Sequence, residues 1–151
     1  MKKMKKNDKG FSLVELIIVI AIMAVLVGVL APQFIKYVEQ SRRGTDIQNA
    51  AQIQTAILAD MADGKITASD TGCAFENAGA SGSKIIAATT IATAPTVQGN
   101  LGDSHGDKFM VSYNVGAGTC EVYVVADGVT YILTNPLTAG FYKTDETPTA
   151  H

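Results

Sequence analysis

The sequence predicts an α+β protein: a long N-terminal helix, membrane-spanning and then amphipathic, packed on a small antiparallel β-sheet. Three observations predict this fold. Residues 16–31 contain no polar side chain at all. Residues 47–61 then place apolar side chains at helical spacing, and residues 108–133 change to the period of two that is typical of half-buried strands. The 151 residues suffice for one modest core beyond the apolar segment.

The first ten residues are strongly basic, with five lysines and one aspartate. By the positive-inside rule this arm stays in the cytoplasm and the rest of the chain lies outside. A secretory signal peptide begins in the same way, but its cleavage after Ala31 would be followed by Pro32, which makes a poor substrate. The other cut lies between Gly10 and Phe11, where a residue without a side chain leaves the backbone open to a protease. We therefore expect residues 1–10 to be a leader that is removed on maturation.

Residues 11–31 form the apolar part of the helix. Counted from Leu13, it spans about 28 Å at about 1.5 Å per residue, close to the roughly 30 Å of a hydrocarbon core. Glu15 places a carboxylate near its start, where an unpaired charge costs several kcal/mol. We expect this carboxylate to need a partner, and the neighbouring turns offer no cation. The alternative is a glutamate that snorkels to the headgroups.

Residues 10–15, Gly-Phe-Ser-Leu-Val-Glu, followed by the apolar run and Pro32, resemble the N-terminus of a type IV prepilin. The resemblance covers about residues 9–61, and the remainder matches the pilin-like fold only in its layout. It implies that a prepilin peptidase cuts after Gly10 and N-methylates Phe11. It also implies that Glu15 neutralises the amino terminus of a neighbouring subunit during assembly.

The resemblance implies a structural protein rather than an enzyme, namely the pilin subunit of an extracellular type IV pilus or fimbrium, of the kind used in cell adhesion or twitching motility. Its partners would be copies of the chain in a helical filament, prepilin peptidase, an inner-membrane assembly platform with its ATPase, and membrane lipid before assembly. The precursor would be a single-pass protein of the cytoplasmic membrane. Two alternatives stay open: a pseudopilin of a type II secretion or DNA-uptake system, and a bitopic membrane-anchored binding domain that never polymerises.

The charge of the matured chain argues against a nucleic-acid binder of the usual kind. Without residues 1–10 the chain would hold seven basic and thirteen acidic residues, a net charge of −6. So few cations cannot follow a phosphate backbone. A filament that touches DNA at its tip by other means stays open.

Residues 32–63 are predicted to continue the helix as its amphipathic half, so that one helix covers residues 12–62. Pro32 removes a backbone donor, and we expect either a soft joint that serves assembly or a simple break at the membrane surface. Glu39 precedes Arg43 by four residues, the favourable order for an ion pair, and Gly64 is a natural C-cap. The helical period runs through Ile47, Ala50, Ala51, Gln54, Ile57, Leu58 and Met61.

Residues 64–107 have no sustained period and are expected to form a variable αβ loop that covers one edge of the sheet. The loop contains Asp103, His105 and Asp107. Their spacing matches no zinc or EF-hand motif, so we expect a solvated turn and no catalytic residue, metal or cofactor.

Residues 108–134 are predicted to form an antiparallel β-meander of three strands, with turns at residues 116–118 and 127–128. In the second strand, Cys120, Val122, Val124 and Ala126 alternate with the outward positions. Residues 135–151 are expected to be a C-terminal tail.

Cys73 and Cys120 both lie in the part predicted to be outside the cytoplasm. Two cysteines there most simply make one disulfide. Closing a loop of roughly fifty residues would stabilise the fold by about 4 kcal/mol. The alternative is two thiols without a bond.

Overall fold

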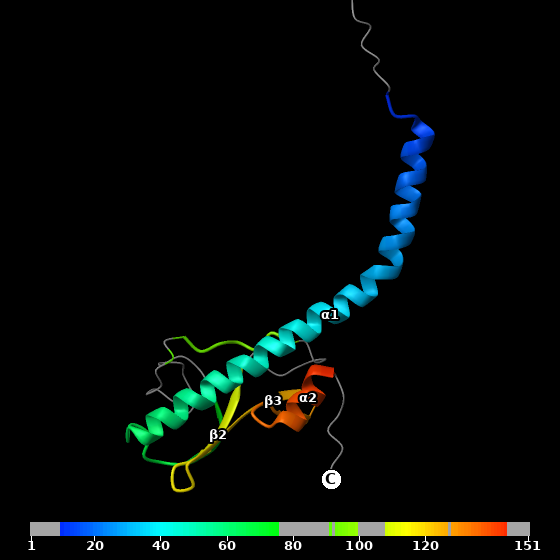
Figure 1. Cartoon of the computed structure of the whole chain (residues 1–151). Helices are drawn as coiled ribbons and strands as arrows, with labels where there is room; N and C mark the ends of the chain where they lie inside the picture. Colours follow the sequence, from blue (N-terminus) through cyan, green and yellow to red (C-terminus); the bar gives the residue numbers. More distant parts are fainter. Residues whose placement is uncertain (1–9, 76–90, 92, 100–107, 127, 145–151) are drawn as a thin grey trace, which may run out of the picture. The chain divides into compact units, whose positions relative to one another are not determined.

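The computed structural model describes residues 10–75, 91, 93–99, 108–126 and 128–144. Residues 1–9 of the expected leader, most of the expected loop including residues 103–107, and the last residues 145–151 lie outside the described set. Within that set the elements follow in the order α1, β1, β2, β3, β4, α2 (Figure 1). The chain divides into two units, Met1–Tyr37 and Val38–His151, and each is described by itself.

Helix α1, Leu13–Ala62, has the extent that the sequence predicts. It continues through Pro32, so the alternative of a helix break at this residue is wrong. At its end Gly64 has a φ of 71°, and its N–H donates to the carbonyl of Met61 at 3.1 Å. A left-handed residue at this position is the usual glycine C-cap, as predicted.

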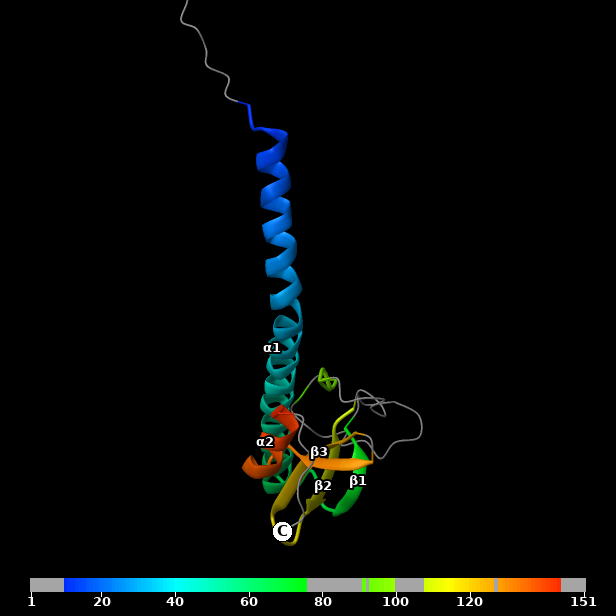
Figure 2. The same cartoon turned by 90° about the vertical axis from the view of Figure 1, so that its right-hand side faces the viewer.

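The second unit contains a four-stranded antiparallel sheet in the order β1-β2-β3-β4. Figure 2 labels three of its strands, β1, β2 and β3. The predicted meander is β2, Met110–Asn114, β3, Thr119–Ala126, and β4, Val129–Ile132. Gly118, with a φ of 66°, closes the turn between β2 and β3. Strand β3 buries every second residue, which is the alternation that the sequence shows.

Strand β1, Asp70–Ala74, lies inside the segment that is expected to be a loop, so the sheet has one strand more than predicted. It pairs with β2, and its register shifts between Asp70 and Cys73. Gly72 lies at this irregularity with a φ of 75°. A five-residue strand with a bulge and a glycine has no period of two, and for this reason no local pattern predicts it.

Helix α2, Pro136–Thr144, corrects the expectation of a tail over residues 135–151. The side chain of Asn135 accepts a hydrogen bond from the N–H of Leu137 at 3.0 Å. Pro136 occupies the first helical position, where its missing N–H costs nothing. The Asn-Pro pair that ends the sheet therefore also starts a helix, which buries Ala139 and Tyr142.

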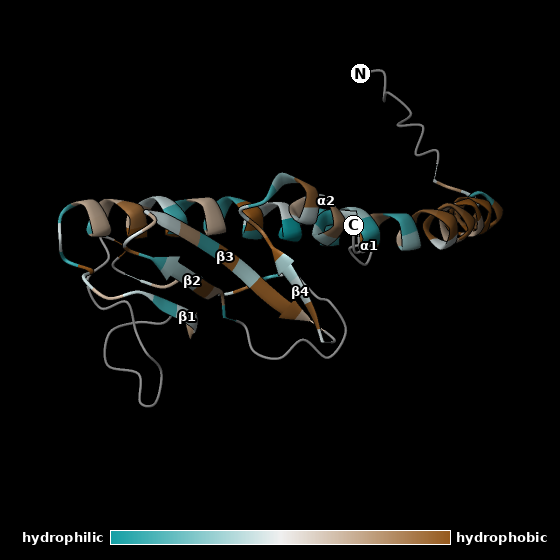
Figure 3. Ribbon diagram, turned by 90° about the horizontal axis from the view of Figure 1, so that it is seen from below, coloured by the Kyte–Doolittle hydropathy of each residue, from teal (hydrophilic) through white to brown (hydrophobic). Residues whose placement is uncertain are grey.

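One hydrophobic core joins the second half of α1 to the sheet and to α2. Ile53, Ile57, Phe109, Val111 and Tyr142 in this core are fully buried. Figure 3 shows the apolar colouring continuous over the N-terminal part of α1 and patchy over its second half.

The buried face of α1 differs in part from the predicted face. Ala51 is exposed, whereas Ile53 is buried. Three charged side chains, those of Arg43, Asp46 and Asp60, are also buried. A period built on hydropathy cannot include such residues, because their burial depends on partners elsewhere in the chain.

The structure gives no disulfide between Cys73 and Cys120, contrary to the expectation. Cys73 lies in β1 and Cys120 in β3, and β2 runs between these two strands. Strands two places apart are separated by about 10 Å, whereas a disulfide needs Cα atoms within about 7 Å. Instead, the thiol of Cys73 donates to the carbonyl of Val111 at 3.4 Å.

Both thiols should therefore resist alkylation in the native chain. Burial raises the pKa of Cys120 to about 12, so very little of the nucleophilic thiolate exists at mildly alkaline pH. Iodoacetamide should leave Cys120 unmodified in the folded chain and label both cysteines after unfolding in urea, as counted by mass spectrometry. A disulfide-linked peptide in a non-reducing digest would contradict this assignment.

Candidate functional site

The N-terminus of α1 is closed by a capping box formed by Ser12 and Glu15. The N–H of Ser12 donates to Oε2 of Glu15 at 2.8 Å, and the N–H of Val14 donates to Oγ of Ser12 at 3.4 Å. The first helical backbone bond runs from the N–H of Leu16 to the carbonyl of Ser12. The Ser-x-x-Glu spacing is a recognised start signal for a helix. Glu15 thus has a partner within its own chain, although that partner is a backbone N–H and carries no charge.

Gly10 and Phe11 lie just before this helix and are open on all sides. Phe11 is 94% exposed, and a Cβ added to Gly10 would meet nothing within 4 Å. The chain itself therefore sets no steric demand for glycine at position 10. Phe11 and Glu15 line one shallow hollow together with Leu16, Ile18 and Val19, so the residue after the expected cut lies close to the carboxylate.

The apolar side chains of α1 in the first unit have no packing partner in the described residues. From Leu13 to Leu30 the exposure of the large apolar side chains lies between 47% for Val19 and 73% for Leu13. By length and composition this is a helix that could cross a membrane, with a mean hydropathy of 3.1 in its best window. A helix that is apolar all round needs lipid or other apolar helices around it.

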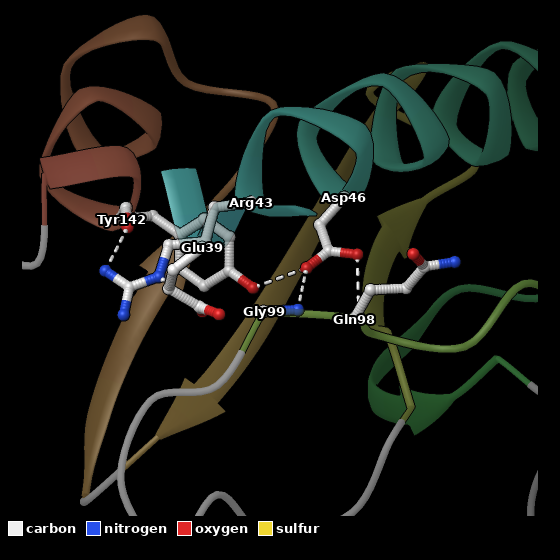
Figure 4. Close-up of polar contacts among 6 residues, drawn as sticks. All are labelled: Glu39, Arg43, Asp46, Gln98, Gly99 and Tyr142. Atoms are coloured by element: carbon white, nitrogen blue, oxygen red, sulfur yellow. Dashed lines mark hydrogen bonds and ion pairs between the residues drawn. The ribbon is translucent and has the colours of Figure 1, made fainter. Parts of the chain in front are cut away.

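A second polar site, which no pattern in the sequence predicts, lies in the other unit around Asp46. Its carboxylate accepts three hydrogen bonds: from the N–H of Gln98 at 2.9 Å, from the N–H of Gly99 at 2.7 Å and from the hydroxyl of Tyr142 at 2.7 Å (Figure 4). The side chain is fully buried. One acid on α1 thus holds the segment before residue 100 and helix α2.

Arg43 and Tyr142 complete this cluster. Nε of Arg43 pairs with Glu39 at 3.1 Å, as the spacing in the sequence predicts, and a terminal nitrogen donates to the carbonyl of Tyr142 at 3.2 Å. The guanidinium carbon lies 5.9 Å from the centre of the Tyr142 ring. Burial, with the hydrogen bond to Asp46 as the next cause, raises the pKa of Tyr142, so its hydroxyl stays a donor.

Gly99 is the one position where this cluster requires glycine. A Cβ there would lie 2.5 Å from the hydroxyl of Tyr142, 2.8 Å from Cγ of Arg43 and 3.0 Å from the carboxylate of Asp46. No local pattern in the sequence marks these residues as neighbours, because they lie on three segments far apart along the chain.

Among the described residues, no group of three or more His, Cys, Asp or Glu side chains could hold a metal ion. Asp103, His105 and Asp107 lie outside those residues. Among the described carboxylates, Glu15 caps a helix, Asp46 holds the cluster with Tyr142, and Asp60 and Asp63 both pair with Lys65.

Comparisons with known proteins match the N-terminal segment. The family model described as the prokaryotic N-terminal methylation motif matches residues 5–31. The chain is 39% identical over 62 residues to a type IV major fimbrial protein FimA of Dichelobacter nodosus, a stretch that covers 41% of this chain and 40% of that protein. It is 38% identical over 68 residues to prepilin peptidase-dependent protein A of Clostridium perfringens, covering 44% and 49% of the two chains.

A longer and weaker similarity covers almost the whole chain. The FimA of Dichelobacter nodosus strain VCS1703A is 27% identical over 148 residues, which are 97% of this chain and 91% of that protein. The stronger matches span only about two fifths to a half of their relatives. No solved structure gives a significant match.

These findings define a chain with a prepilin-type N-terminus, that is, one that carries the prokaryotic N-terminal methylation motif on an exposed apolar helix. The resemblance to type IV pilins that the sequence indicates is confirmed. The long helix with its small antiparallel sheet agrees with this, since it is the pilin-like α+β architecture.

The Asp46 cluster predicts that Gly99→Ala destabilises the fold. The added methyl group must displace the hydroxyl of Tyr142 or the stem of Arg43, and such overpacking costs about 1–3 kcal/mol. Urea unfolding of the full chain in detergent, followed by circular dichroism, measures the change.

Gly140→Ala in α2 is the matched control. A Cβ there meets nothing within 4 Å, and replacing a helical glycine by alanine should stabilise by about 0.5–1 kcal/mol. If both substitutions change the free energy of unfolding by the same amount, the close approach at Gly99 does not contribute to stability.

Proposed function

We propose that this chain is the subunit of an extracellular type IV pilus, cleaved between Gly10 and Phe11, N-methylated at Phe11 and polymerised through its N-terminal helix. The observation that carries the proposal is the methylation motif over residues 5–31, which coincides with a helix that is apolar on every side and has no partner within the described residues. Such a helix suits two surroundings in turn, first a bilayer and then a bundle of identical helices.

The precursor is a single-pass protein of the cytoplasmic membrane. Five lysines among residues 1–10 hold the leader in the cytoplasm, and the unit with the sheet lies outside. Cleavage removes these lysines and frees the amine of Phe11. Without them the helix has no basic anchor at its start, which favours its extraction into the filament.

The charge of Glu15 provides the counter-ion for the Phe11 amine during assembly. The pKa of an α-amine in water is about 8, so the amine is mostly protonated at neutral pH and costly to bury alone. In the filament core the Phe11 amine of one subunit pairs with Glu15 of its neighbour. The capping bond from Ser12 holds the Glu15 side chain back toward the helix start, next to Phe11.

The partners of this function are copies of the chain in a helical filament, prepilin peptidase, an inner-membrane assembly platform with its ATPase, and membrane lipid before assembly. One relative is named a prepilin peptidase-dependent protein, a name that supports the processing step and specifies no filament. For this reason a pseudopilin of a secretion or DNA-uptake system is the second candidate. Long surface filaments in electron micrographs would favour the pilin, and their absence would favour the pseudopilin.

Processing is the first test. Gly10→Val should accumulate as uncut precursor, because a branched side chain then blocks the backbone at the scissile bond. Gly28→Ala, also an open glycine of the same unit, is the control and should be cut normally. Mass spectrometry of the native N-terminus measures both. An N-terminal mass that includes residues 1–10 in purified filaments would exclude the proposed cleavage.

The charge of Glu15 is the second test. Glu15→Gln keeps an oxygen that can accept from the N–H of Ser12 but removes the charge, so the Phe11 amine loses its counter-ion at a cost of about 3–5 kcal/mol. We expect sheared cells to yield little filament although the precursor is still cut.

Ser12→Ala is the control for this test. It removes the hydroxyl cap but keeps the Glu15 charge, and it should assemble much closer to the wild type. If Glu15→Gln yields wild-type amounts of filament, the electrostatic account is wrong. It is also wrong if Ser12→Ala, which keeps both the charge and the bond from the N–H of residue 12 to Glu15, fails as completely as Glu15→Gln.

A further inference from the structure

Beyond the apolar run, helix α1 keeps three more large side chains exposed. Phe34, Ile35 and Tyr37 are 69%, 68% and 67% exposed, although each is bulky and largely apolar. All three belong to the first unit, which ends at Tyr37. The buried face of α1 begins only at Arg43. These residues therefore lie exposed on α1, beyond the predicted span.

Their distance along the helix places them at a membrane surface. If Leu13 marks the cytoplasmic edge of the hydrocarbon, Phe34 lies about 32 Å and Tyr37 about 36 Å further on, at about 1.5 Å per residue. The hydrocarbon core is about 30 Å thick, and the bilayer with its headgroups is about 40–45 Å. Both aromatic residues thus fall in the headgroup layer of the outer leaflet.

Their chemistry fits that layer. Tyrosine has an apolar ring and a polar hydroxyl, and it is enriched where a membrane meets water. Phe34 and Tyr37 are three residues apart and so lie on the same side of the helix. Lys36 lies between them in sequence, and among the residues that the structure describes it has no carboxylate within ion-pair distance. A long cationic side chain at this depth can reach lipid phosphates.

We propose that Phe34, Ile35, Lys36 and Tyr37 form an interfacial anchor that binds the headgroup region of the outer leaflet and fixes the depth of the precursor in the bilayer. The anchor rests on the proposed function only in that the precursor spans a membrane. Its occupant is lipid, because the four residues continue the apolar span directly and carry a cation that anionic headgroups attract.

Tryptophan fluorescence can locate each position, since the sequence contains no tryptophan. Three single-tryptophan variants of the full chain are reconstituted in vesicles of phosphatidylcholine and phosphatidylglycerol: Tyr37→Trp for the anchor, Met23→Trp for the middle of the span and Leu137→Trp for the water-exposed control. Met23 lies about 15 Å from Leu13, half the hydrocarbon thickness. Leu137 is 76% exposed on α2, in the other unit.

Lipids brominated near the glycerol or near the chain ends then report depth. The indole at position 37 should be quenched more by bromine near the glycerol than by bromine near the chain ends. The indole at position 23 should show the reverse order. The indole at position 137 should not be quenched, and its emission should lie to the red of both others. In vesicles that contain phosphatidylglycerol, the indole at position 37 should be quenched more than in vesicles of phosphatidylcholine alone. Lys36→Gln in the Tyr37→Trp background should reduce this difference.

The outcomes separate the anchor from the span. If the indole at position 23 is not quenched, the helix does not span the membrane, and the proposal of an anchor is wrong as well. If position 23 is quenched while position 37 behaves like position 137, the anchor alone is wrong. Iodide in the buffer quenches an indole that is exposed to water. If the indole at position 37 is shielded from iodide, is not quenched by brominated lipid and emits at a wavelength that depends on the protein-to-lipid ratio, a second copy of the chain covers this surface. That result would also overturn the lipid anchor.

Discussion

The first half of α1 is apolar on every side, and it finds no partner within the described part of its own chain. An apolar helix left in water would be unfavourable by about 25 cal/mol for each Å² exposed. The chain must therefore place this segment in lipid or among other apolar helices. The basic residues among 2–9, the open backbone at Gly10 and the carboxylate of Glu15 all lie at the start of this helix in the sequence. The proposed function gives each of them a role in a change of the helix's surroundings.

Glu15 joins two demands that would otherwise conflict. An acid in the first turn favours the helix through the macrodipole and, in this chain, through its bond to the N–H of Ser12 at 2.8 Å. The same charge is unfavourable in lipid, and a neutral backbone donor offsets only part of that cost. A protonated amine close by would offset more of it. Under the proposed function, the carboxylate would be tolerable in the precursor and better satisfied beside the amine that cleavage would free.

The sequence predicts those elements whose signals are local. The bounds of α1, the Gly64 cap and the alternation in β3 each depend on residues within a few positions of one another. Strand β1 is not predicted because it is short and bulged. Helix α2 is not predicted because an Asn-Pro pair can either end a strand or start a helix, and here it does both. The Asp46 cluster could not be predicted at all, since its members meet only after the chain has folded. The predicted disulfide is wrong for the same reason, as two cysteines in one compartment say nothing about the strand between them.

The lack of that disulfide changes how the second unit is held together. No covalent link joins β1 to β3. The carboxylate of Asp46 is one polar contact that holds both the segment before residue 100 and helix α2. Removing one partner of a buried polar group leaves the others unsatisfied at about 1–3 kcal/mol each. The contacts of Asp46 and Arg43 with Tyr142 also tie α2 to the helix that would enter the filament core. Substitutions in α2 that move Tyr142 should therefore loosen both segments together, whereas substitutions on its exposed side, such as Leu137, should disturb neither.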